Sequence, residues 1–223
     1  RIIESSLERI HPKKGCEKMK KIIFVVLFLL ITINPVGNTI ARSINSTENT
    51  LEVFGHHELS IKQAIDLAYP SALKWNKNAQ LLQGVNIDLD KPGKSIGRNG
   101  KRKYWNIDFG VPDTNKIFLV TIREGEIVEA KDVGREGDSP YPKKEFIKLK
   151  DIKYDSPELL KKALKMGSIY PGKDWAKGFN FMIRKDTDTN IPLMLIIGWN
   201  SDQTKMKAAG FNVKTGEYIP PQN

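Results

Sequence analysis

The stretch AAGFNVKTGEYIPP, residues 208–221, reads as an edited copy of IFLVTIREGEIVEA, residues 117–130. In both stretches apolar residues lead into a Gly-Glu pair, a pattern typical of a strand that enters a tight turn. Recurrence at this distance predicts one structural unit that is built twice.

A predicted amphipathic helix lies upstream of each ending. In the first copy Ser60 is the expected N-cap, and Gln63 completes a capping box. In the second copy Ser156 is the expected N-cap, Pro157 suits the first helical position, and Gly167 suits the C-terminal stop. The residues expected to be buried are Ile61, Ala64, Ile65 and Ala68 in the first helix and Leu159, Leu160, Ala163 and Leu164 in the second.

Further features recur in the same order after each helix. They are a Tyr-Pro pair (Tyr69-Pro70, Tyr170-Pro171) and then a tryptophan (Trp75, Trp175). Alternating apolar residues follow and predict half-buried strands, and turn-forming residues at 112–115 and 200–203 predict hairpins. The inward-facing strand residues are expected to be Val85, Ile87, Leu89, Trp105, Ile107, Phe109, Phe179, Phe181 and Ile183.

These features predict an α+β fold of two tandem modules, each a helix packed on a small antiparallel sheet. The first module is expected at 58–133 and the second at 154–223. Residues 134–153 are interpreted as a linker because they begin with a run rich in Gly, Pro and charge. One helix covers one face of a sheet, so the other face is expected to be available for a partner or for the other module.

The N-terminal residues are expected to direct export. Residues 19–41 combine two lysines, a twelve-residue apolar run and a small residue at Ala41, which predicts a signal peptide cleaved after Ala41. The alternative is that this segment is retained as an anchor. Residues 1–18 are interpreted as a leader or a misplaced start, and 42–57 as an N-terminal linker. The protein is therefore expected to be secreted, in the medium or in the cell envelope.

Composition limits the chemistry of the exported chain. Its one cysteine, Cys16, precedes the signal, so disulfide scaffolds, thiol nucleophiles and cysteine metal sites are excluded after cleavage. The whole chain carries a net charge of +10, and residues 1–41 hold seven basic and three acidic residues, which leaves +6. This balance favours contact with anionic surfaces or acidic proteins.

The two copies together resemble the PepSY family. The residues that carry the resemblance are Ala64, Ala68, Trp105 and VTIREGEI in the first copy and Ala163, Trp199 and FNVKTGEYI in the second. The first copy has REGE where the family favours a turn containing Thr or Asp. This family occurs in the propeptides of secreted metallopeptidases and as free-standing exported modules. The resemblance implies a binding or inhibitory module that regulates a peptidase.

Candidate catalytic residues are few. His56 and His57 are adjacent and lack the i, i+4 spacing of two ligands on one helix face. The stretch DTDTN (186–190) begins like a calcium loop, but Ile191 and Ile197 stand where Gly and Glu are needed, so a strand-connecting turn is expected. Carboxylate pairs suited to glycan hydrolysis are Asp88/Asp90, Asp186/Asp188 and Glu124/Glu126. We expect a non-enzymatic protein without metal or cofactor.

The densest positive cluster is a candidate anion-binding loop, made of Lys94, Arg98, Lys101, Arg102 and Lys103. Two functions follow from these observations. The first is a secreted, non-catalytic binding module that regulates or inhibits an extracellular peptidase. The alternative is a cell-envelope protein that binds an anionic polymer through the basic loop; no nucleic-acid partner is expected for an exported chain, and no membrane span after cleavage. Salt separates the two, since charge contacts at a surface are screened.

Overall fold

The computed structural model describes residues 58–87 and 95–220, and it has an α+β fold. The expectations for 1–18, 19–41, 42–57, His56, His57, Asp88, Leu89, Asp90 and Lys94 lie outside these residues. None of the described helices is long and apolar enough to cross a membrane. The elements are α2 (Ile61–Trp75), β1 (Gln80–Asn86), β2 (Tyr104–Gly110), β3 (Ile117–Arg123), β4 (Glu126–Asp132), two short 3₁₀ turns (Lys143–Glu145, Leu149–Asp151), α3 (Ser156–Lys165), β5 (Asn180–Asp186), β6 (Ile191–Trp199), β7 (Met206–Asn212) and β8 (Tyr218–Ile219).

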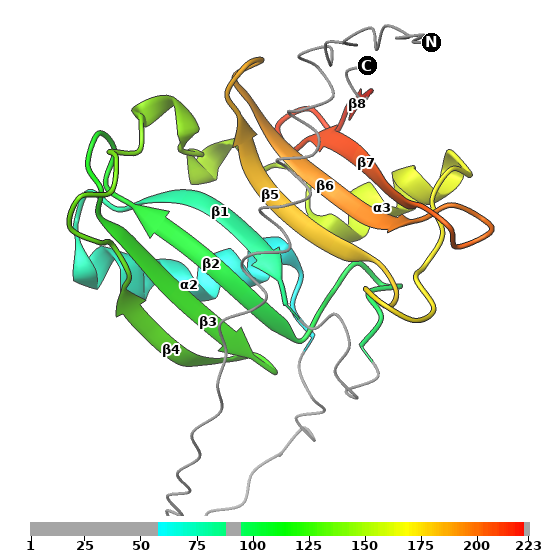
Figure 1. Ribbon diagram of the computed structural model, residues 1–223, viewed down its shortest axis with the longest axis horizontal. Coiled ribbons are helices and arrows are strands. Elements are labelled where there is room, and N and C mark those ends of the chain that lie inside the picture. Colours follow the sequence, from blue (N-terminus) through cyan, green and yellow to red (C-terminus); the bar gives the residue numbers. More distant parts are fainter. Residues whose placement is uncertain (1–57, 88–94, 221–223) are drawn as a thin grey trace, which may run out of the picture. The chain divides into compact units, whose positions relative to one another are not determined.

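All eight strands form one continuous antiparallel sheet in the order β4-β3-β2-β1-β5-β6-β7-β8. Each half of the chain contributes a helix followed by four strands, and the halves meet where β1 pairs with β5. Both helices lie behind the sheet in Figure 1, so they cover the same face. The halves therefore join edge to edge within one sheet and are not clearly two separate modules.

One hydrophobic core runs through both halves. A single row of paired residues crosses six strands on the helix-covered face, in the order Val120, Ile107, Gly84, Ile183, Met194 and Phe211. Every member of this row is buried. Gly84 leaves room for its neighbours, because a Cβ atom there would lie 3.0 Å from Ile107 and 3.3 Å from Ile183. The two helices pack on this shared core.

Helix α2 confirms the expected start and corrects the expected end. Ser60 and Gln63 form the capping box, and Ile61, Ala64, Ile65 and Ala68 are buried as predicted. The helix nevertheless continues through Pro70 to Trp75. Packing explains this, because the Trp75 ring stacks on Phe118 at 5.0 Å and its indole nitrogen donates to Asp132.

Helix α3 begins one residue earlier than predicted. Asp155 is the N-cap and forms the capping box with Glu158, so the expectation that Ser156 caps the helix is wrong. Gly167 follows the last turn with a positive φ, as expected for a C-terminal stop. Leu164 is 43% exposed and not buried, because at 100° per residue it lies at the margin of the stripe. The residues of that stripe are Leu159, Leu160 and Ala163.

The strand predicted around Val85, Ile87 and Leu89 lies earlier in the chain. In β1 the core-facing residues are Leu81 and Gly84, and the pairing register with β2 shifts between Leu81 and Gln83. That shift breaks the two-residue period on which the prediction depended. The Tyr-Pro and tryptophan features are not equivalent either, since Tyr69-Pro70 lies inside α2 whereas Tyr170-Pro171 follows α3.

The two similar endings do occupy equivalent places. Residues 117–130 form β3, a turn and most of β4, while 208–219 form the end of β7, a turn and β8. Gly125 and Gly216, in the two turns, have φ of 86° and 72°. The predicted hairpin turns at 112–115 and 200–203 are present, and so are the inward-facing residues Trp105, Ile107, Phe109, Phe179, Phe181 and Ile183.

Residues 134–153, interpreted as a linker, pack against the first half of the chain. Tyr141 makes two backbone hydrogen bonds to the β2–β3 turn: its amide donates to the Thr114 carbonyl at 2.9 Å, and its carbonyl accepts from the Asp113 amide at 2.8 Å. Ile147 is buried and donates its amide to the Leu81 carbonyl at 2.8 Å. The segment thereby covers the end of β1 that β5 does not reach.

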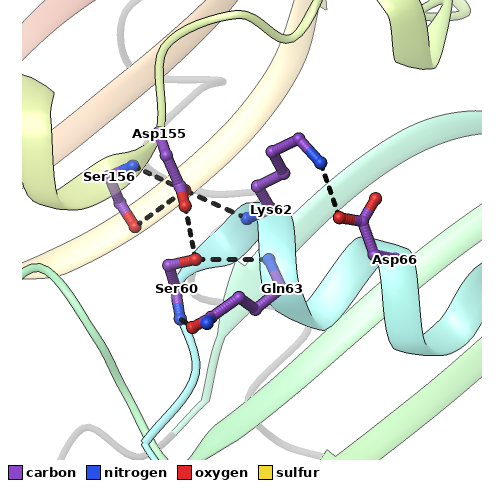
Figure 2. A network of polar contacts seen from close by, with 6 residues as sticks. All are labelled: Ser60, Lys62, Gln63, Asp66, Asp155 and Ser156. Carbon is purple, nitrogen blue, oxygen red and sulfur yellow. Dashed lines mark hydrogen bonds and ion pairs between the residues drawn. The ribbon is translucent and has the colours of Figure 1, made fainter.

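The N-termini of the two helices meet at Asp155 (Figure 2). Its carboxylate accepts from the Ser156 amide at 2.7 Å and from the Lys62 amide, in the first turn of α2, at 3.1 Å. It also accepts from the hydroxyl of Ser60, the N-cap of α2. One negative charge therefore serves two helix N-termini, where the helix dipoles are positive. This contact ties the two halves together behind the sheet.

We expect Asp155→Ala to lower the free energy of unfolding by about 2–3 kcal/mol, because a cap is worth roughly 0.5–2 kcal/mol and this residue serves two helices. Chemical denaturation followed by circular dichroism measures the loss, which should appear in a single transition because the core is shared. Asp66→Ala is the matched control, since its exposed ion pair with Lys62 contributes about 0.3–0.5 kcal/mol. Two separate transitions would show that the halves are independent modules.

Candidate functional site

The sheet face opposite the helices carries an apolar strip along β6. In this strand Pro192, Met194, Ile196 and Gly198 are buried, and the residues between them are half-buried. These half-buried residues, which face away from the helices, are Ile191, Leu193, Leu195, Ile197 and Trp199. In an antiparallel sheet with one solvated face, such positions are normally polar. We call these five residues the β6 strip.

The corresponding strand of the first half is polar at the equivalent positions. Ile107 in β2 pairs with Gly84, and Met194 in β6 pairs with Ile183. Because Gly84 and Ile183 pair with each other at the junction, Ile107 and Met194 are equivalent. Their neighbours facing away from the helices are Asn106 and Asp108 in β2, but Leu193 and Leu195 in β6. The apolar outer face thus belongs to the second half.

Asp108 is a buried carboxylate on this outer face. It is 7% exposed and accepts from the Gln83 side-chain amide at 2.7 Å. Burial raises its pKa from the ordinary 3.8 to about 6, and the hydrogen bond from Gln83 opposes that rise. Among the described residues the salt-bridge pairs do not include it.

The segment 138–145 lies close to this carboxylate. Burial raises the pKa of the Tyr141 hydroxyl, and the negative charges of Asp138, Asp108 and Glu145 raise it further. A shallow cavity of about 370 Å³ is lined by residues 138–142 and Glu145. A raised pKa at Asp108 does not on its own identify a catalytic set.

The predicted anion-binding cluster is divided by the structure. Arg98 is exposed and Lys101 is partly exposed, so both can meet an anion. Lys103 is 8% exposed, and its Nζ lies 3.6 Å from a carboxylate oxygen of Glu124. Anion binding by this loop stays a prediction that depends on its exposed members.

Arg102 lies inside the protein, where it links the two halves. It is fully buried, and its Nη1 donates to the carbonyls of Lys177 at 3.0 Å and Phe179 at 3.4 Å. Its backbone pairs with Leu59 in both directions at 2.9 Å. In the same loop Gly100 lies directly against the start of α3. A side chain would not fit there, because a Cβ atom would lie 2.4 Å from the Cα of Pro157. Part of the basic segment therefore has a structural role, because Arg102 holds the two halves together.

The described carboxylate pairs occupy turns. Asp186 accepts from the Asp188 amide and from the Thr189 hydroxyl in the β5–β6 turn, which agrees with the expected strand connection at 186–190. Glu124 and Glu126 flank the β3–β4 turn. Within residues 58–87 and 95–220, no group of three or more His, Cys, Asp or Glu side chains is placed to hold a metal ion.

Two features of the outer face escaped the sequence reasoning. The β6 strip is visible in the sequence as an uninterrupted apolar run, IPLMLIIGW, but such a run also fits a strand buried on both faces. The burial of Asp108, whose side chain accepts from Gln83, has no local signal in the sequence. In a comparison with known proteins, no protein-family model, curated protein or solved structure matches this chain.

Proposed function

We propose that this chain is an exported, non-catalytic binding protein of the PepSY type, built from two tandem modules, that docks an extracellular peptidase on the β6 strip. The single observation that carries the docking surface is the outer side of β6, which is apolar from Ile191 to Trp199. The solvated face of an antiparallel sheet is normally polar, so a partly exposed apolar strip there favours an interaction site. The predicted export signal and the PepSY-like endings support a peptidase as the partner.

The division of labour between the halves supports the same proposal. The first half supplies a polar outer face and the brace at Arg102, whereas the second half supplies the apolar surface. Duplication followed by specialisation of one copy accounts for a repeat whose copies differ in this way on the outer face. A partner would then bind the second half while the first half supports it.

The test is a titration of the secreted protein against the purified secreted metallopeptidases of its host, with complex formation and peptidase activity both followed. We expect a complex that persists at high salt, because burial of apolar surface is not screened. Binding to cell-wall polymer that is lost at high salt, with no peptidase complex, would instead favour the basic loop around Arg98 and Lys101.

We expect Leu195→Lys to weaken this complex by at least about 30-fold, since it places a charge at the centre of an apolar contact. Calorimetric titration measures the dissociation constant. Leu164→Lys is the matched control, because Leu164 is an exposed leucine on α3, away from the sheet. Equal weakening by both variants, or none by Leu195→Lys, would remove the β6 strip as the docking surface.

A further inference from the structure

We infer that Tyr170, Trp175 and Trp199 form the anchor of the docking surface, and that the partner's contact patch is a protein surface with an apolar centre and an acidic rim. This inference rests on the proposed function in so far as both place a protein partner on the outer face. It goes further by naming the residues that dominate the contact and the charge of the partner.

The three aromatic residues lie together at the end of the β6 strip. Tyr170 and Trp199 form an antiparallel bridge in which each amide donates to the other's carbonyl at 2.8 Å. Residues directly opposite in such a bridge point to the same face, so Tyr170 shares the outer face with Trp199. Trp175 packs edge-on against Trp199, with ring centres 6.3 Å apart and planes at 85°.

Much of this aromatic surface faces solvent. Tyr170 is 42% exposed and Trp175 is 39% exposed. Tryptophan and tyrosine are enriched among the few residues that provide most of the energy in protein interfaces. Their exposure beside a continuous apolar strip indicates a contact centre, whereas scattered single apolar residues need no explanation.

The loop that carries Trp175 is held in place before any partner arrives. Gly172 and Gly178 close it by two reciprocal backbone hydrogen bonds of 2.8 Å. The Ala176 carbonyl accepts from the Asn180 side chain at 3.1 Å, and the Lys177 carbonyl accepts from Arg102. A fixed loop loses little conformational entropy on binding, which favours affinity.

Gly172 lets this loop close over the Trp199 ring. A Cβ atom at Gly172 would lie 2.7 Å from the Trp199 indole nitrogen. That nitrogen is buried, and among the described residues it has no hydrogen-bond acceptor. The Trp199 ring is therefore held by packing against Gly172 of the loop and against the ring of Trp175.

The polar groups around the cluster favour a protein over a carbohydrate. The Gln203 side chain already accepts from the Lys173 amide and donates to the Asn200 carbonyl. The Asn200 side chain is engaged by Thr204 and Lys205 in the β6–β7 turn. These amides are thus occupied within the protein, whereas a sugar needs free groups for its hydroxyls. The neighbouring surface along β6 is apolar instead.

The charges around the cluster select an acidic partner. Exposed lysines on the two adjoining segments have no ion pair among the described residues, and they are Lys173, Lys177 and Lys205. Two acids lie in the same segments, Asp174 and Asp202. Asp202 accepts from the amide and the hydroxyl of Thr204, which lower its pKa and tie it to the turn. Complementary acidic groups would steer association and fix orientation.

The first experiment measures dissociation constants of the secreted protein with the host metallopeptidase that binds it. Trp175→Ala and Tyr170→Ala should each weaken binding by about 30-fold or more. Tyr218→Ala is the matched control, because Tyr218 is 39% exposed but pairs with the core residue Phe211. Retained melting temperature would show that each variant folds. Binding unchanged by Trp175→Ala would overturn the inference and leave the proposed function standing.

The charge of the partner is tested by reversal. Lys173→Glu with Lys177→Glu should weaken binding about tenfold at low salt and less at high salt. Lys161→Glu with Lys165→Glu, on the exposed side of α3, is the control pair and should leave binding within about twofold. Equal weakening of binding by the two double variants would contradict an acidic rim on the partner.

A second experiment separates this inference from the peptidase. A displayed peptide library is selected on the wild-type protein and the selected ligands are tested on Trp175→Ala. We expect ligands with apolar residues flanked by Asp and Glu that lose binding to the variant. If no peptidase binds but such ligands are found, the proposed function fails and the inference stands. Ligands that bind the variant equally well, or that are basic, would overturn it.

Discussion

Arg102→Met is expected to lower the free energy of unfolding by about 2–5 kcal/mol. The substitution keeps a long apolar side chain but removes the guanidinium that donates to the carbonyls of Lys177 and Phe179. A buried carbonyl that loses its donor costs roughly 1–3 kcal/mol. Because those carbonyls belong to the second half and Arg102 to the first, the loss loosens the joint between the halves.

The measurement is urea denaturation followed by tryptophan fluorescence. Arg102→Lys should recover only part of the loss, since an ammonium cannot reproduce the fork of donors that a guanidinium presents. Arg98→Met is the matched control from the same basic segment, and as an exposed position it should change stability by less than about 0.5 kcal/mol. Equal stability of the two methionine variants would contradict the bracing role of Arg102.

This result would also separate two interpretations of the basic segment. From the sequence, Arg98, Lys101 and Arg102 look alike, because a run of positive residues between two strands predicts a solvated loop. The difference between them comes from Gly97 and Gly100, which allow the loop to pack against the second half. A Cβ atom at Gly97 would lie 2.3 Å from the Phe179 carbonyl oxygen. Only the folded contact shows why these glycines are needed.

Local chemistry made the start of α2 and the inward-facing residues of β2 predictable, namely Trp105, Ile107 and Phe109. Ser60 and Gln63 form a capping box through backbone groups three residues apart, so the pattern is complete in the sequence. The end of α2 was not predictable in this way. Pro70 usually ends a helix, but the contacts of Ala72 and Trp75 with residues far along the chain outweigh its cost.

The way the two halves join could not be predicted from local sequence patterns either. From the sequence, the free face of each sheet is expected to be available for a partner or for the other module, and no local pattern indicates that the edge strands pair. The pairing of β1 with β5 brings the two helices to one face and leaves the β6 strip on the other. The location of the candidate docking surface therefore depends on a contact between residues about one hundred positions apart.

Asp108→Asn is expected to stabilise the protein at neutral pH by about 1–3 kcal/mol. The pKa of Asp108 in the folded state, about 6, lies above its ordinary value of 3.8. The folded state therefore holds the proton more tightly than the unfolded state. Its contribution to stability is complete below about pH 4 and is lost as the pH rises through about 6. A difference of about two pKa units corresponds to about 3 kcal/mol.

Asparagine removes this pH dependence because it stays neutral while it can still accept from Gln83. The upper limit is reduced because the new amide group needs an acceptor of its own. Unfolding free energies at pH 4, 5, 6 and 7 measure the effect, and the gain over wild type should grow across this range. Asp174→Asn, at an exposed position, is the control, and its difference in unfolding free energy from wild type should stay the same across these pH values. A gain from Asp108→Asn that did not vary with pH would show that the pKa of Asp108 is the same in the folded and unfolded states, and that the packing around β2 alone decides its effect.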